Sequence, residues 1–423
     1  MAPGGQIGYE AGAMSRIILC RFGELFLKSG NRRRFEGVLH KNMRAALVGI
    51  AADAVLQRVR VEPAHGRVFV HAPDDATALE AADRLQRVFG LVSVSVTAVT
   101  SPDLEEITAA AITLVERERQ REHPSSFKVE ARRTDKTFPH RSLEIARKVG
   151  ARVIEATGLS VDVHNPALRV GIEVAANRAF VYAGARSAPG GLPVGVSGRA
   201  LLLLSGGIDS PVAGWLAAKR GLALDGVYFH SPPYIGEKSR DKVLTLGRQL
   251  ATWQALDSVT VVNFTQAQRR LREVGPPELA VVLYRRMMMR IADEIADQRH
   301  CDGLITGENL GQVASQTIQN LTAIEAAARR VVLRPLVTYD KVDTMALARR
   351  IGTYDTSVLP FDDCCSLFVP RHPATAARIQ DAERAEAKLD VAAEIAAAVA
   401  SAEHVMLTER RPAAPVVRTA GVQ

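Results

Sequence analysis

Short apolar runs alternate with helical patterns in the second half of this chain. Five runs of strand length, at 201–204, 226–229, 259–264, 304–306 and 331–333, are separated by segments in which apolar residues have helical spacing. Strand followed by helix, repeated along the sequence, predicts a parallel sheet with helices on both faces. We therefore expect residues 197–395 to form a doubly wound α/β domain.

The first half of the chain has a different pattern. An apolar run at 17–19, a helical segment at 34–52 and strands at 55–56 and 68–70 give a β-α-β-β order of ferredoxin-like size. After residue 75, helical periodicity around 79–88 and 107–115 precedes strands at 127–130, 168–174 and 179–182. We expect two α+β domains, at 15–74 and 75–186.

The segments outside these domains are rich in small residues, proline or glycine. Residues 187–196 contain Ser187, Pro189, Gly190, Gly191 and Pro193 and predict a linker. Residues 1–14 have neither the basic nor the apolar part of a signal peptide, so we expect a disordered leader. The chain is alanine-rich from residue 374, and 396–423 is expected to be a helical end and a disordered tail.

Composition and charge narrow the class of protein. No apolar run has the length of a membrane span, and four cysteines in 423 residues are too few for a secreted disulfide scaffold. We therefore expect a cytoplasmic protein. The net charge is +8, and basic residues cluster at 21–60 and 128–148. Two basic clusters ahead of a nucleotide-binding pattern favour an RNA partner over a merely solvated surface.

The apolar run at 201–204 ends in the segment Ser205-Gly206-Gly207-Ile208-Asp209-Ser210, and a helical pattern follows at once. Glycines let backbone N–H groups approach an anion, serines add short donors, and a helix N-terminus contributes its positive dipole end. The result is a phosphate cradle with a carboxylate, Asp209, inside it. The segment resembles the PP-loop of ATP pyrophosphatases, which split ATP between its α- and β-phosphates. No Gly-Lys-Ser/Thr of the Walker type follows.

Ligands of doubly wound sheets bind at the carboxyl ends of the strands, and three further loops lie there in the predicted order. Residues 230–234 are aromatic and proline-rich, and 306–317 are rich in glycines and amides. Arg334 and Lys341 follow the last run and offer cations for phosphate charge. Each loop taken alone is also consistent with ordinary loop structure.

The chain resembles the tRNA 4-thiouridine synthetase (tRNA sulfurtransferase) family over roughly residues 15–390. The similar segments occur in family order, at 21–24, 31–33, 128–138, 205–211, 230–233, 285–288, 306–317, 334–336 with Lys341, and 363–365. The segment at 128–138 is similar to the core of a THUMP domain, an RNA-binding module. The resemblance therefore implies ferredoxin-like and THUMP α+β domains followed by a PP-loop ATP pyrophosphatase domain.

The family resemblance implies an activity. Members bind Mg-ATP, adenylate the C4 oxygen of uridine 8 in tRNA, and replace that oxygen with sulfur supplied as a persulfide by a cysteine desulfurase. Adenylation is needed because AMP is a good leaving group, whereas the carbonyl oxygen is a poor one. A role in supplying sulfur for the thiamine thiazole is also implied, and a homodimer is one assembly that we consider.

The resemblance also assigns residues. Asp209 would organise Mg²⁺ and the phosphates, and Lys341 would stabilise charge as pyrophosphate leaves. ATP contacts fall on Leu203, Leu204, Ser205, Gly206, Gly207, Asp209, Ser210, Tyr228, Phe229, Arg285, Gly307 and Gln316. Contacts to tRNA are expected at Arg32, Arg33, Lys128, Arg132, Arg133 and Lys136.

The sulfur carrier has fewer candidates. Some members carry a C-terminal rhodanese domain, but only about fifty residues follow Thr375 here and none is cysteine, so we expect the short form. Cys364 is the carrier by similarity to the family, with Cys365 and direct use of sulfide as alternatives. Cys20 and Cys301 are expected to be packing residues. An iron–sulfur cluster on Cys301, Cys364 and Cys365 is a minor alternative, since no Cys-x-x-Cys occurs.

Two other functions compete with this hypothesis. A different PP-loop enzyme, acting on tRNA or amidating a small molecule, would share the cradle. In the small-molecule case it would need neither the basic N-terminal half nor the paired cysteines. A non-catalytic tRNA-binding scaffold would not need Asp209, Lys341 and Cys364.

Overall fold

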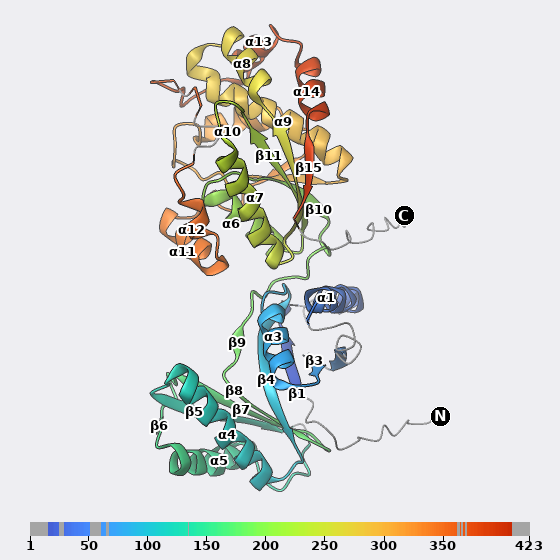
Figure 1. Ribbon diagram of the computed structural model, residues 1–423, viewed down its shortest axis with the longest axis vertical. Coiled ribbons are helices and arrows are strands. Elements are labelled where there is room, and N and C mark those ends of the chain that lie inside the picture. Colours follow the sequence, from blue (N-terminus) through green and yellow to red (C-terminus); the bar gives the residue numbers. More distant parts are fainter. Residues whose placement is uncertain are drawn as a thin grey trace, which may run out of the picture. The chain divides into compact units, whose positions relative to one another are not determined.

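The computed structural model describes residues 16–24, 29–50, 61–64, 67–133, 135–361, 364, 367–368 and 370–407. The chain divides into two compact units, Met1–Leu192 and Pro193–Gln423 (Figure 1). Several expectations lie outside the described residues: the leader, the strand at 55–56, the tail from 408, and Cys365 with its neighbours Asp362 and Asp363.

The N-terminal unit contains one mixed sheet and helices that cover one of its faces. Its strands are β1 (Arg16–Phe22), β2 (Val61–Ala64), β3 (Arg67–Ala72), β4 (Leu91–Thr100), β5 (Ser126–Arg133), β6 (Ser160–Val161), β7 (Leu168–Val174), β8 (Ala179–Ala183) and β9 (Arg186–Ser187). Its helices are the short 3-10 turn η2 (Ser29–Asn31), α1 (Arg32–Leu47), α3 (Asp75–Leu85), α4 (Leu104–Glu122) and α5 (Ser142–Thr157).

Strand β4 joins the two halves of this unit. The strand order is β2-β3-β1-β4-β8-β7-β5-β6, and β4 pairs with β1 on one side and with β8 on the other. This strand was not among the predicted strands, although Ser93, Ser95 and Thr97 alternate with its valines with the period of a strand. Ser95 and Thr97 are buried, and the Thr97 hydroxyl donates to the Ile17 carbonyl at 2.7 Å, so the polar positions are satisfied inside the sheet.

Two apolar clusters pack helices against this sheet. Ile18 and Cys20 of β1 are buried with residues of α1 and α3, whereas Ile107 of α4 and Val149 of α5 pack on β5, β7 and β8. Helix α3 therefore packs with β1 and β3, although the sequence analysis assigned residues from 75 onward to the second domain. On the other face of the sheet, the rings of Phe69 and Phe180 stack 4.8 Å apart.

The C-terminal unit has the doubly wound architecture that the sequence predicts. Its strands are β10 (Arg199–Leu203), β11 (Ala223–His230), β12 (Leu256–Asn263), β13 (Gly303–Ile305), β14 (Val331–Leu333) and β15 (Glu403–Met406). Its helices are α6 (Asp209–Lys219), α7 (Glu237–Thr252), α8 (Thr265–Val274), η3 (Pro277–Leu279), α9 (Ala280–Gln298), α10 (Ile318–Glu325), α11 (Lys341–Ile351), α12 (Tyr354–Ser357), α13 (Ile379–Glu386) and α14 (Val391–Ala400).

The order in this second sheet is β14-β13-β10-β11-β12-β15, and all neighbours except β12 and β15 are parallel. Consecutive residues of β10 face opposite layers. Leu201 packs in the cluster that contains α9, whereas the Leu202 side chain lies against Gly214 of α6. Helices therefore cover both faces, and the carboxyl ends of the parallel strands share one edge.

The end of the described chain differs from the expectation of a helical end. Helix α14 ends at Ala400, and β15 then pairs antiparallel with β12. The physical reason is that β12 would otherwise present an unpaired edge, and four residues of extended chain satisfy its backbone groups.

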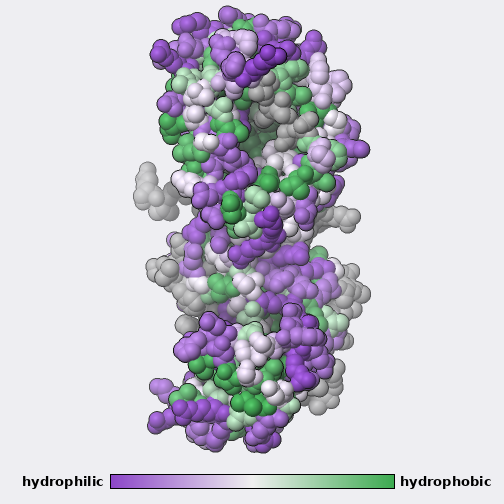
Figure 2. Space-filling model, turned by 90° about the vertical axis from the view of Figure 1, so that its left-hand side faces the viewer, coloured by the Kyte–Doolittle hydropathy of each residue, from purple (hydrophilic) through white to green (hydrophobic). Residues whose placement is uncertain are grey.

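No helix among the described residues is long and apolar enough to cross a membrane. In the view of Figure 2, hydrophilic and hydrophobic residues are interspersed over the visible surface.

Candidate active site

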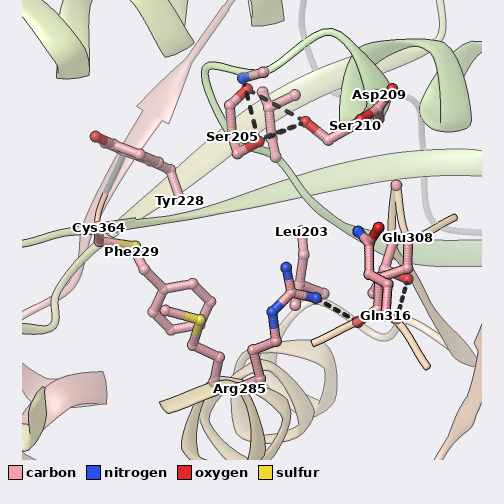
Figure 3. A pocket seen from close by; sticks show the side chains of 15 residues that line it. Leu203, Ser205, Asp209, Ser210, Tyr228, Phe229, Arg285, Glu308, Gln316 and Cys364 are labelled. Atoms are coloured by element: carbon pink, nitrogen blue, oxygen red, sulfur yellow. Dashed lines mark hydrogen bonds and ion pairs between the residues drawn. The ribbon is translucent and has the colours of Figure 1, made fainter. Parts of the chain in front are cut away.

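The carboxyl ends of β10, β11 and β13 surround a cavity of about 230 Å³. Figure 3 shows the turn with Ser205 and Ser210 along one side of it, Tyr228 and Cys364 together at another, and Glu308 and Gln316 across from them. The cavity is lined by Leu203, Leu204, Ser205, Gly207, Asp209, Ser210, Tyr228, Phe229, Arg285, Met288, Thr306, Gly307, Glu308, Gln316 and Cys364. The structure thus brings together almost all residues that the sequence analysis assigned to ATP, from five separate segments.

The turn between β10 and α6 is held by its own hydroxyl groups. The Ser205 amide donates to Ser210 Oγ at 2.9 Å, the Gly207 amide donates to Ser205 Oγ at 3.3 Å, and the two hydroxyl oxygens are 3.2 Å apart. Gly206 lies in the same turn. Because α6 begins at Asp209, its N-terminal dipole end opens directly onto the cavity, as an anion site requires.

Gly307 lets the loop after β13 approach the start of α6. A Cβ atom at this position would lie 2.6 Å from the Ser210 backbone nitrogen and 2.8 Å from the Asp209 carbonyl carbon. Both are backbone atoms and cannot rotate away. Glycine at this position is therefore required for the two loops to form one wall of the cavity.

Asp209 is bound by two side chains from distant segments. The Lys341 ammonium donates to both of its carboxylate oxygens, at 2.7 and 2.9 Å, and the Gln312 amide donates to Oδ2 at 2.9 Å. Lys341 is the first residue of α11 and reaches the cavity through this contact. From the sequence, Gln312 was predicted only to lie in a loop. A glutamine in an amide-rich loop has no sequence pattern that would predict its hydrogen bond to Asp209.

A buried ion cluster supports the opposite wall. Glu308 is 2% exposed and contacts the guanidinium group of Arg285, while Arg334 Nε donates to Glu308 Oε2 at 2.7 Å. Burial by itself raises the pKa of Glu308, but Arg285 and Arg334 outweigh it and hold the pKa below its usual value. Glu308 is therefore an anion that keeps Arg285 in place. The sequence analysis did not assign it a role, because its two partners are 23 and 26 residues away.

Tyr228 and Phe229 form an aromatic wall at the end of β11. Phe229 packs edge to face with Phe264 at 5.3 Å, and Tyr228 lies 5.8 Å from the His230 ring. Apolar aromatic surface beside a phosphate cradle is suited to holding a nucleobase.

The described cysteines have different surroundings. Cys364 is buried but lines the cavity, near Tyr228 and Phe229 (Figure 3). Cys20 and Cys301 lie inside apolar clusters, and burial raises the pKa of each to about 12. Their thiolates are scarcely populated near neutral pH, so both are packing residues.

Among the residues described, no group of three or more His, Cys, Asp or Glu side chains could hold a metal ion. Asp209 is a single carboxylate beside the phosphate cradle. Mg²⁺ typically takes one or two carboxylates together with substrate phosphates. A single carboxylate beside a phosphate cradle is a donor set that fits a magnesium ion bound together with a nucleotide.

The residues assigned to tRNA lie in two places in the N-terminal unit. Arg32 and Arg33 begin α1, where Arg32 donates to Glu36 at 2.8 Å. Lys128, Arg132 and Arg133 lie on β5, and Lys136 lies in the turn that follows.

Their surroundings are not equivalent. Arg132 and Lys136 are exposed, and Lys128 pairs with Glu130 at 3.0 Å. Arg133 donates to the carbonyl groups of Lys136, Phe138 and His140, so its guanidinium group organises the turn.

Three protein-family models match this chain. Residues 195–391 match the model described as thiamine biosynthesis protein (ThiI), 17–95 the ThiI ferredoxin-like domain, and 101–183 the THUMP domain. The expected ferredoxin-like, THUMP and PP-loop domains are thereby confirmed.

Alignments with similar proteins cover most of this chain. A protein of Thermoanaerobacter sp. (strain X514), named a probable tRNA sulfurtransferase, is 43% identical over 89% of this chain and 96% of its own length. A protein of Moorella thermoacetica with the same name is 45% identical over 90% of this chain and 96% of its own. Among solved structures, one described as a 4-thiouridine synthetase–RNA complex with bound ATP superposes with a TM-score of 0.80 and 34% identity. That match covers 92% of this chain and 99% of the other.

Proposed function

Because the chain belongs to the ThiI family of tRNA sulfurtransferases, we propose that it uses ATP to convert uridine 8 of tRNA to 4-thiouridine. The chain is an enzyme of the transferase class. The observation that carries the proposal is the single cavity in which the phosphate cradle at Ser205–Ser210 and the thiol of Cys364 both lie.

Adenylation uses the cradle. The C4 oxygen of the uridine attacks the α-phosphorus of ATP, and pyrophosphate leaves. The turn amides and the N-terminus of α6 face the phosphates, Leu203, Leu204, Tyr228 and Phe229 enclose the adenosine, and Arg285 and Gln316 face it from the opposite wall. Lys341 offers positive charge for the leaving pyrophosphate.

Magnesium enters with the nucleotide. Mg²⁺ would screen the phosphate charge, and Asp209 is the carboxylate placed to bind it. In the structure Asp209 accepts from Lys341 and Gln312, so binding of Mg-ATP exchanges or shares these contacts. Lys341 would then be able to contact the phosphates, whose negative charge it would offset.

Sulfur transfer uses Cys364. A persulfide on its Sγ, received from a cysteine desulfurase, attacks C4 with its terminal sulfur and displaces AMP. The product is a disulfide between Sγ of Cys364 and the sulfur atom that is now bound to C4. A second thiol attacks Sγ of Cys364, which releases the sulfur on C4 as 4-thiouridine and leaves a protein disulfide. Two electrons from an external thiol reductant then restore the two thiols.

The second thiol is assigned to Cys365, which lies outside the described residues. This cycle requires a reducing compartment, and we propose the cytoplasm. A homodimer remains the assembly that we would test first, by light scattering.

Nucleoside mass spectrometry tests the proposal directly. Purified protein incubated with unmodified tRNA, Mg-ATP, a cysteine desulfurase, cysteine and a thiol reductant should form 4-thiouridine, with AMP and pyrophosphate released in equal amounts. The same nucleoside should be missing from tRNA of cells that lack the gene. ATP hydrolysis without thiolated tRNA, or thiolation at another nucleoside, would contradict it and favour a different PP-loop enzyme.

A further inference from the structure

Gln268 connects the cysteine segment to the loop after β11. It lies on α8 and is fully buried. Its Nε2 donates to the Cys364 carbonyl oxygen at 2.9 Å, and its Oε1 accepts from the Ser231 hydroxyl at 2.8 Å. One amide side chain therefore fixes the backbone of Cys364 relative to the aromatic wall of the cavity.

Other residues of α8 contact the same two segments. The Thr265 hydroxyl donates to the Pro232 carbonyl at 2.6 Å, and the Arg272 guanidinium carbon lies 4.6 Å from the centre of the Phe368 ring. Phe368 also packs edge to face with Tyr234 at 5.2 Å. Helix α8 thus contacts Cys364, Phe368 and the loop 231–234.

Because Gln268 is fully buried, its side-chain amide needs hydrogen-bond partners within the protein. A buried amide that loses its partners leaves unpaired polar groups away from water, which destabilises the fold around them. The donor to the Cys364 carbonyl lies 96 residues away in sequence, on a separate helix. The thiol reaches the cavity from a backbone anchored at this point.

We propose that Gln268 is a positioning residue for sulfur transfer: its hydrogen bond to the Cys364 carbonyl holds the thiol facing the site of adenylation. The inference rests on the proposed role of Cys364. It predicts that Gln268 serves the second half of the reaction and not the first, because Gln268 does not line the cavity and its side-chain amide hydrogen-bonds to Ser231 and Cys364.

The test compares Gln268→Met, which keeps the size of the side chain but removes both bonds, with Gln266→Met at an exposed position of the same helix. Gln268→Asn is the milder second variant, since it keeps a buried amide that is too short to span both partners. Each is assayed with tRNA for AMP formation, for thiolation with desulfurase and cysteine, and for thiolation with free sulfide.

In Gln268→Met we expect thiolation with desulfurase to fall about 10- to 100-fold, as for a misplaced reacting group, while AMP formation stays within twofold. Free sulfide should restore thiolation, because it needs no thiol of the protein. Gln268→Asn should show a smaller loss of the same kind, and Gln266→Met none.

Two results would overturn the inference: an equal loss of AMP formation and thiolation without rescue by sulfide, or normal desulfurase-dependent thiolation in Gln268→Met. The Cys364→Ser variant separates this from the proposed function. If Cys364→Ser itself thiolates normally with desulfurase, the cysteine route is wrong, whatever Gln268 does.

Discussion

The ammonium group of Lys341 lies 2.7 and 2.9 Å from the two carboxylate oxygens of Asp209, across 132 residues of sequence. The pair joins the first turns of α6 and α11 at the phosphate cradle. In this arrangement the Lys341 ammonium and the Asp209 carboxylate partly neutralise each other at the site where a nucleotide would bind.

Replacing Asp209 with Ala should abolish tRNA-dependent conversion of ATP to AMP and leave tRNA affinity nearly unchanged. The reason is that Asp209 belongs to the C-terminal cavity, whereas the residues expected to bind tRNA belong to the N-terminal unit. AMP formation and filter binding measure the two effects. Asp343→Ala, an exposed acidic residue in the first turn of α11, is the matched control. Retained AMP formation in Asp209→Ala would refute the role of Asp209 in adenylation.

Replacing Gly307 with Ala should reduce adenylation about 100-fold while the protein stays folded. The new methyl group would meet the backbone of Asp209 and Ser210 at 2.6–2.8 Å, so one wall of the cavity must move. Initial rates of pyrophosphate release, with circular dichroism as the check on folding, measure this. Gly311→Ala strains the same loop at a backbone φ of +76° without a steric clash, so a smaller loss in that variant would show that the contact with α6 causes the effect at Gly307. Equal rates for Gly307→Ala and wild type would show that the loop after β13 can move away from the start of α6 without reducing the rate of adenylation.

Glu308→Gln should destabilise the C-terminal unit by about 3–5 kcal/mol at neutral pH, because two guanidinium groups lose their buried counter-ion. The pKa of Glu308 is lowered by folding, so its stabilising effect is complete above the pKa of the unfolded chain. The effect is lost as the pH falls through the lower folded pKa. Urea unfolding at several pH values should show the gap between variant and wild type narrowing in acid.

The exposed partner of Arg334, Glu325, provides the control for this experiment. Glu325→Gln should change the free energy of unfolding by only about 0–1 kcal/mol, since its side chain is nearly half exposed. A similarly small effect for Glu308→Gln would mean that the ion pairs of Glu308 with Arg285 and Arg334 do not stabilise this wall of the cavity.

Cys20 and Cys301 should resist alkylation in the native protein. Burial raises the pKa of both thiols to about 12, so at pH 8 the reactive thiolate is scarce and also inaccessible. Mass spectrometry after iodoacetamide treatment should find these two peptides unmodified, and modified once urea is present. Cys20→Ala and Cys301→Ala should each retain thiolation. Labelling of either cysteine without denaturant would contradict their assignment as packing residues.

The exposed cations near β5 should contribute to the salt dependence of tRNA binding. If Arg132 and Lys136 contact phosphates, removing both should make the log–log slope shallower by about 0.7–0.9 per lost contact. Arg133→Ala should act differently: it removes donors to three carbonyl groups and loosens the turn itself. Fluorescence anisotropy at several salt concentrations measures the slopes, and an unchanged slope in the double variant would mean that these residues are only solvated.

The sequence by itself determined the parts of this protein that depend on near neighbours. The cradle is built from hydrogen bonds among Ser205, Gly207 and Ser210, which lie within five residues of one another, so consecutive residue types specify it. The parallel strands could likewise be predicted, because each is a short apolar run between helices. The family resemblance then supplied candidate residues in several loops.

The tertiary structure alone decided which distant residues meet. The alternating pattern of β4 can be read in the sequence, although that strand was missed, but its pairing with both β1 and β8 depends on the whole sheet. Strand β15 was missed because only the free edge of β12 makes its four residues a strand. The contacts of Asp209 with Gln312, of Glu308 with Arg334, and of Gln268 with Cys364 join segments 26 to 103 residues apart. For a glutamine or glutamate in a loop or helix, the local sequence does not predict which distant residue it will contact. The partner depends on which strand ends the sheet brings to one edge, and that depends on burial of the whole apolar core.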